Sequence, residues 1–135
     1  MENAYIYLDE AVHPDVIKKL LRDYKTATAK TGEQLRWAYD EAAFPYTIED
    51  SPQGEDRWFY LRGLHERYNV IVIAVESGKS PNGAVDGRCC VQITLPNDAT
   101  QGDKGKANEL CKWIAGRLHG KLQLFNGRIM PPIDE

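Results

Sequence analysis

The chain has 135 residues, of which 42% are hydrophobic, and its 17 Lys and Arg against 20 Asp and Glu give a formal net charge of −3. This length suits a single domain over residues 1–135, large enough to hold a core without disulfides or metals. The near balance of charge argues against a strongly basic nucleic-acid binder and against a highly charged disordered segment. The longest apolar run, Val70–Val75, is far shorter than the roughly 20 residues that cross a bilayer. The N-terminal residues also lack the basic start of a secretory signal, so we expect a cytoplasmic protein with no membrane partner.

The N-terminal part predicts a strand followed by a helix. Residues Ala4–Leu8 alternate in the manner of a strand. From Pro14 onward the apolar residues recur at helical spacing, which predicts an amphipathic helix. This stripe consists of Val16, Ile17, Leu20, Leu21, Tyr24, Ala27 and Thr28. Pro14 suits the first helical position, and Gly32 is predicted to end the helix as the left-handed residue after its C-cap.

The middle of the chain is β-rich. Leu35, Trp37 and Tyr39 alternate, which indicates a short strand. Pro45 disfavours helix at Phe44, the residue before it, and Tyr46–Glu49 is a further candidate for extended structure. Further strands are predicted over residues 57–64, 69–76 and 88–95. The second of these three is apolar on both alternating sets, so we expect a central strand that is covered on both faces.

The C-terminal third predicts a second amphipathic helix from about Lys104 to Leu118 and then a hairpin. Asn126-Gly127 suits a type I′ turn, in which both central residues have positive φ. The predicted order is β-α-β-β-β-β-α-β-β. We therefore expect an α+β two-layer sandwich, with both helices on one face of a mostly antiparallel sheet.

The three cysteines, Cys89, Cys90 and Cys111, do not form a CxxC motif. An odd count without that motif argues against a disulfide framework and a zinc site, and we expect reduced, at least partly buried thiols. The three histidines, at the ends of predicted elements, have no ligand spacing. We therefore predict neither a metal nor a cofactor.

A glycine-bearing basic segment precedes and opens the second helix. Free N–H groups at a helix N-terminus attract anions, and two lysines add positive charge. The anion-binding candidates are Gly102, Lys104, Gly105 and Lys106. The spacing does not match a P-loop, because two residues rather than four separate the glycines. The alternative is an ordinary entry into a helix, with Asp103 as a cap.

Aromatic residues gather between positions 37 and 60. Such residues can wall a pocket or mark an interface, although they also fill cores. The pocket or interface candidates are Trp37, Phe44, Tyr46 and Trp58.

Three segments taken together resemble a known family: AYIYL, TAKTGEQLRWAYDEAAFPY, and GDKGKANELCKWIAGRL followed by LQLFNGRIM. They are similar to a small family of uncharacterised proteins from Bacillus and related bacteria, which is a domain of unknown function. The resemblance covers most of the chain. It implies a cytoplasmic protein of a Gram-positive lineage and supplies no catalytic residue.

Two functions follow from these observations. The chain has no GxSxG, HExxH or GxGxxG motif, which favours a non-catalytic binding or protein-interaction domain, in a homodimer or with another protein. A strand edge or an apolar patch would form its contact surface. The alternative is a small-molecule enzyme or ligand binder that holds an anionic small molecule at residues 102–108. A deep cavity joining that segment to the aromatic residues would favour the second function, and a closed surface with a flat apolar face the first.

Overall fold

We describe the protein from a computed structural model, which describes residues 1–35, 44–51, 57–77 and 89–132, without the side chains of residues 29–35 and 77. The elements of the described residues follow the order β-α-β-β-β-β-α-β-β. They are β1 (Glu2–Leu8), α1 (Pro14–Leu35), β2 (Tyr46–Asp50), β3 (Trp58–Gly63), β4 (Val70–Ser77), β5 (Cys89–Leu95), α3 (Gln101–Leu118), β6 (Lys121–Gln123) and β7 (Ile129–Met130).

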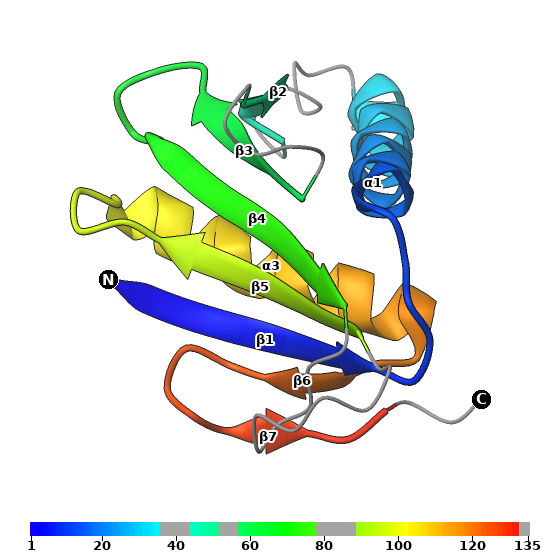
Figure 1. Cartoon of the computed structure of the whole chain (residues 1–135). Coiled ribbons are helices and arrows are strands. Elements are labelled where there is room, and N and C mark those ends of the chain that lie inside the picture. Colours follow the sequence, from blue (N-terminus) through cyan, green and yellow to red (C-terminus); the bar gives the residue numbers. More distant parts are fainter. Residues whose placement is uncertain (36–43, 52–56, 78–88, 133–135) are drawn as a thin grey trace.

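The strands form one seven-stranded sheet in the order β2-β3-β4-β5-β1-β6-β7. Every neighbouring pair is antiparallel. The N-terminal strand β1 lies between β5 and β6, while α3 runs behind β4 and β5 in the view of Figure 1. β1 and β5 pair from Glu2 opposite Leu95 to Leu8 opposite Cys89, so segments far apart in the sequence meet at the sheet centre.

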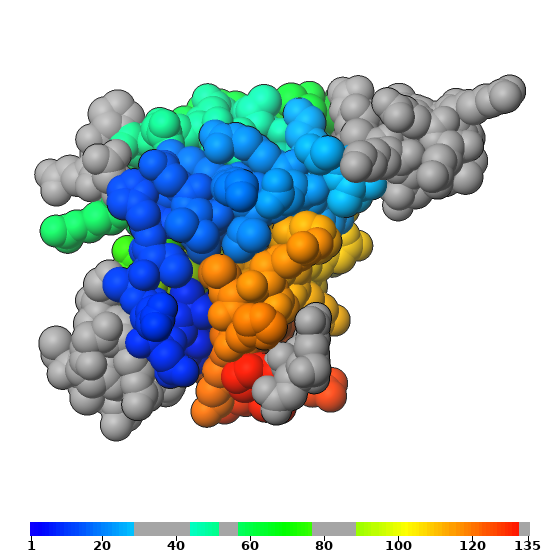
Figure 2. All heavy atoms as spheres, turned by 90° about the vertical axis from the view of Figure 1, so that its right-hand side faces the viewer, coloured from blue at the N-terminus to red at the C-terminus, as the bar shows by residue number. Residues whose placement is uncertain are grey.

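Both helices cover the same face of this sheet, which confirms the predicted α+β fold. Figure 2 shows α1 and the C-terminal part of α3 side by side on the surface. The indole N–H of Trp113 on α3 donates to the backbone carbonyl of Leu20 on α1, at 2.8 Å. The ring of Tyr24 meets that indole edge to face, with centroids 5.4 Å apart. The two helices therefore form one continuous layer.

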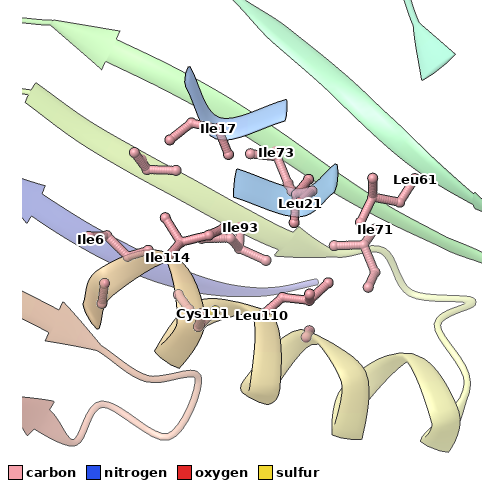
Figure 3. Packing of buried hydrophobic residues seen from close by; sticks show 14 of the residues in the cluster. Ile6, Ile17, Leu21, Leu61, Ile71, Ile73, Ile93, Leu110, Cys111 and Ile114 are labelled. Carbon is pink, nitrogen blue, oxygen red and sulfur yellow. The ribbon is translucent and has the colours of Figure 1, made fainter. Parts of the chain in front are cut away.

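The core lies between this helical layer and the sheet. Ile17 and Leu21 of α1, and Leu110 and Ile114 of α3, are at most 1% exposed. Figure 3 shows these side chains directed at strand residues such as Ile73. Fully burying one such side chain contributes roughly 1.5–3 kcal/mol, so this apolar layer is the main stabilising feature of the fold.

The predicted end of the first helix was wrong. α1 continues through Gly32 to Leu35, and Gly127 is the glycine with positive φ among the described residues. An interior glycine costs a helix about 1 kcal/mol but does not by itself end it. Leu35 is therefore helical rather than part of a strand, while Trp37 and Tyr39 lie outside the described residues.

The C-terminal hairpin also differs from its prediction. Gly127 has φ of 86°, but Asn126 is not among the residues with positive φ. The Gly127 N–H donates to the Leu124 carbonyl and the Leu124 N–H to the Arg128 carbonyl, each at 2.9 Å. This pattern fits a three-residue loop with glycine in the left-handed position rather than a two-residue type I′ turn.

Candidate functional site

The predicted anion-binding segment lies inside α3, which begins three residues earlier than predicted. Thr100 is the N-cap: its side chain accepts a bond from the Asp103 N–H at 3.0 Å, and the Thr100 N–H donates to the Asp103 carboxylate at 3.0 Å. This reciprocal capping box satisfies two backbone donors at the helix start. The helix N-terminus therefore already holds a carboxylate of its own.

Asp103 is fully buried and binds residues from three parts of the fold. Its carboxylate accepts bonds from the Tyr46 hydroxyl at 2.6 Å and from the Asn69 backbone N–H at 3.0 Å, besides the Thr100 N–H. Burial, followed by the bond to Asp103, raises the pKa of Tyr46 above its ordinary value, so the phenol remains a donor. The cluster ties the start of α3 to β2 and to the turn between β3 and β4.

The segment and the aromatic residues thus meet by direct contact. A Cβ added to Gly102 would lie 2.6 Å from the Arg67 carbonyl oxygen and 2.8 Å from Cε1 of Tyr68, so only glycine allows this approach. The rings of Tyr68 and Tyr46 are in turn 5.5 Å apart, edge to face. At this junction the start of α3 packs directly against the turn between β3 and β4.

The four anion-binding candidates do not converge on one point. Lys104 and Lys106 lie two positions apart on a helix that turns about 100° per residue, so they project roughly 160° apart. The Lys106 ammonium lies 3.0 Å from the Glu109 carboxylate, and its side chain is 11% exposed. Gly105 faces open space, with no atom within 4 Å of an added Cβ.

The four aromatic candidates also separate. Phe44 and Tyr46 are core residues, 2% and 1% exposed. Trp58 is half-buried at the start of β3. Trp37 lies outside the described residues. Of the three that the structure describes, Trp58 alone reaches the surface.

Three hollows lined by described residues are small. One of about 120 Å³ includes Lys104 in its lining, one of about 40 Å³ lies between α3 and β6, and one of about 20 Å³ lies beside Trp58. Sites for small molecules usually enclose about 300–1,000 Å³. None of the three hollows joins residues 102–108 to the aromatic candidates.

The strands present a second surface on the side of the sheet opposite the helices, and we call it the open face. Its residues alternate with core residues along each strand. Most of them are half-buried, whereas Cys90 is buried and Thr47 and Arg62 are exposed. The residues of the open face include Asn3, Tyr5, Tyr7, Trp58, Tyr60, Arg62, Val72, Ala74, Gln92 and Thr94. Because Val72 and Ala74 are only half-buried, β4 is not fully covered on both faces, contrary to expectation.

Amide and hydroxyl groups occupy the middle of the open face. Asn3 Oδ1 accepts bonds from Thr94 Oγ1 at 2.7 Å and from Gln92 Nε2 at 3.1 Å. These bonds orient the two amides. Among the described residues, no group accepts a bond from Asn3 Nδ2 or donates one to Gln92 Oε1.

Aromatic rings flank these amides. Tyr5 and Tyr7 stack on β1 with centroids 6.1 Å apart and an interplanar angle of 17°. Tyr60 lies on β3, with the Arg62 guanidinium 5.5 Å from its ring centroid. The alternation of Tyr5 and Tyr7, and of Gln92 and Thr94, was visible in the sequence. The sequence did not reveal that β1 and β5 are neighbours, and so these residues were not recognised as one surface.

The remaining chemistry-bearing residues do not form a second site in the described part of the chain. Cys89, Cys90 and Cys111 are buried and form no disulfide, as expected. Burial raises the pKa of the Cys111 thiol to about 12. No group of three or more His, Cys, Asp or Glu side chains among the described residues is arranged to hold a metal ion.

Neither described helix is long and apolar enough to cross a membrane.

Comparisons with known proteins place the chain in a family. No curated protein matches the sequence. A crystal structure of a protein of unknown function from Bacillus stearothermophilus is 40% identical, covers 92% of this chain and 91% of its own, and superposes with a TM-score of 0.61. A sequence profile of the domain of unknown function DUF1885 matches residues 2–131. The resemblance seen in the sequence is thus confirmed, and the chain belongs to the DUF1885 family.

Proposed function

We propose that the protein is a non-catalytic binding domain and that the open face is its contact surface. The observation that carries this proposal is the composition of that face. Half-exposed aromatic rings surround oriented amide groups on the side of the sheet opposite both helices. A surface that offers hydrogen-bonding groups, with no catalytic constellation among the described residues, suits recognition rather than chemistry.

The packing at α3 supports binding over catalysis. In the segment that was expected to hold an anionic group, Gly102 lies directly against Tyr68, and the Asp103 carboxylate accepts a bond from the Tyr46 hydroxyl. The hollow that includes Lys104 holds about 120 Å³, which is small for a substrate.

The partner in this proposal is a protein, a second copy of the chain, or a ligand that lies flat on the open face. A homodimer would place two open faces together and bury the half-exposed rings. The proposal keeps the expected cytoplasmic location, with which three cysteines that form no disulfide agree.

A photo-crosslinking amino acid at Tyr60, introduced into the protein in cells of a Bacillus host, tests the proposal because it labels whatever contacts the open face. The matched control carries the same group at Lys19, an exposed position of α1. We expect adducts from position 60 and not from position 19. Equal labelling at both positions, or none at either, would contradict the proposal.

A further inference from the structure

We infer that the open face binds a short neutral oligosaccharide, laid across β1, β5, β4 and β3 between Tyr5 and Tyr60. This inference rests on the proposed function, because it names the ligand of the same surface. It commits to one chemical class, a chain of uncharged sugar rings, and three features of the open face support it.

The first feature is the spacing of the aromatic rings. The register aligns Tyr60 with Val72, Thr94 and Asn3 across four strands, and Tyr5 lies one row further along. Tyr5 and Tyr60 are therefore three strand spacings apart across the sheet and two residues apart along it, roughly 16 Å in total. Small or slender side chains, such as Ala74 opposite Gln92, lie between them. An extended chain of several sugar rings fits this length, whereas a single ring would reach only one tyrosine.

The second feature is a set of hydrogen-bonding groups between the rings that have no partner among the described residues. Asn3 Nδ2 offers donors and Gln92 Oε1 an acceptor, while the bonds of Asn3 Oδ1 to Gln92 and Thr94 hold both amides in place. Hydroxyl groups both donate and accept, so a sugar can satisfy both amides at once. The C–H faces of the same sugar can pack on the flanking rings, which offer large apolar surfaces.

The third feature is the order of polar and apolar groups. Protein interfaces usually have an apolar, aromatic centre and a polar rim. The open face is arranged differently: the polar Gln92 and Thr94 of β5 lie between Asn3 of β1 and the apolar Val72 and Ala74 of β4, with Tyr5 on β1 and Tyr60 on β3. This arrangement suits a ligand whose polar groups point at the centre of its binding surface.

Charge separates a sugar from a nucleic acid. The residues of the open face between Tyr5 and Tyr60 are uncharged. Glu76, in the row of Cys90 and Tyr7, adds a carboxylate rather than a cation, and the Arg62 guanidinium at the margin lies 2.6 Å from the Glu49 carboxylate. Binding of nucleic acids depends on several unpaired cations that neutralise phosphates. A neutral chain needs no such groups, and the net charge of −3 does not oppose it.

Titrations of the ¹⁵N-labelled protein with defined neutral oligosaccharides test the inference by NMR. The probes are the glucose, xylose and N-acetylglucosamine series, and the variants are Tyr60→Ala and Asn3→Asp, with Lys19→Ala as the control. Asn3→Asp keeps the oxygen that Gln92 and Thr94 use but replaces the free donors. We expect shift changes on β1, β3, β4 and β5 with at least one series, and binding about tenfold weaker in each open-face variant.

The inference is overturned if no series binds, if the shift changes lie on the helices, or if both open-face variants bind as well as the native protein. Melting curves identify a variant that fails to fold, and then Tyr60→Phe, which retains the ring, must preserve binding. A single-stranded oligonucleotide that binds better than every sugar also overturns it. Sedimentation equilibrium distinguishes the two proposals. If the protein is a dimer and Tyr60→Glu dissociates it, the sugar ligand is overturned, but the open face remains the contact surface.

Discussion

The hydroxyl of Tyr46 donates to the buried carboxylate of Asp103 at 2.6 Å, although the two residues lie 57 positions apart. Tyr46 opens β2 at one edge of the sheet, and Asp103 lies in the first turn of α3. The bond joins the sheet edge to the helix that covers the sheet centre. The same carboxylate caps α3, so one buried group serves helix start and tertiary docking together.

The bond between Tyr46 and Asp103 predicts the effect of Tyr46→Phe. This variant leaves a buried carboxylate with one donor fewer, and we expect the free energy of unfolding to fall by about 1.5–3 kcal/mol. The control is Tyr24→Phe, which removes a hydroxyl bonded to the exposed Glu109, for which we expect well under 1 kcal/mol. Urea unfolding of both variants measures the difference. Equal losses would show that the buried bond contributes nothing special.

Two glycines of α3 predict opposite results for the same substitution. Gly105→Ala adds a methyl group to open space and should stabilise the helix by about 0.5–1 kcal/mol. Gly102→Ala places that methyl group 2.6 Å from the Arg67 carbonyl oxygen, so we expect a loss of about 1–3 kcal/mol despite the better helix propensity. Thermal unfolding compares the two. A gain in both would mean that the turn at Arg67 moves away at no cost.

These examples show what the sequence could predict. Periodicity predicted the helices and strands, since each has a local pattern, as with Ile17 and Leu21 on α1. The start of α3 was predicted too late in the chain. Thr100 caps the helix through reciprocal bonds with Asp103, whereas the sequence indicated Asp103 itself as the cap. Tyr46 was named as a pocket or interface candidate because the sequence around it, with a proline and acidic residues, does not distinguish a surface tyrosine from a core tyrosine. The open face was missed because it depends on the pairing of β1 with β5, and strand order is not a local property.

The buried thiol of Cys111 predicts a dependence of stability on alkaline pH. An unfolded thiol ionises near pH 9, whereas burial raises the pKa of Cys111 in the folded state to about 12. The folded state holds the proton more tightly, so this contribution to stability is complete below pH 9 and is lost as the pH rises toward 12. Urea midpoints of the native protein and Cys111→Ala, followed over that range, should converge. Parallel curves would contradict the raised pKa.

The same pKa predicts the chemical reactivity of Cys111. Thiolates rather than thiols attack disulfide reagents, so we expect Cys111 to react with such a reagent at pH 8 only after unfolding. Mass spectrometry of labelled peptides identifies the modified cysteine. Fast labelling of Cys111 in the folded protein would show that its surroundings open readily.

Neighbouring residues of β4 predict the energetic difference between the two faces of the sheet. Ile73 is fully buried beneath the helices, whereas Val72 is half-buried on the open face. Ile73→Ala should lower the free energy of unfolding by about 2–5 kcal/mol, because the rigid core leaves a cavity. Val72→Ala removes fewer buried contacts, and we expect a loss of about 1 kcal/mol or less. Urea unfolding at low protein concentration measures both. A large loss at Val72 that grows with protein concentration would show that a second copy covers the open face, because association stabilises only the folded state.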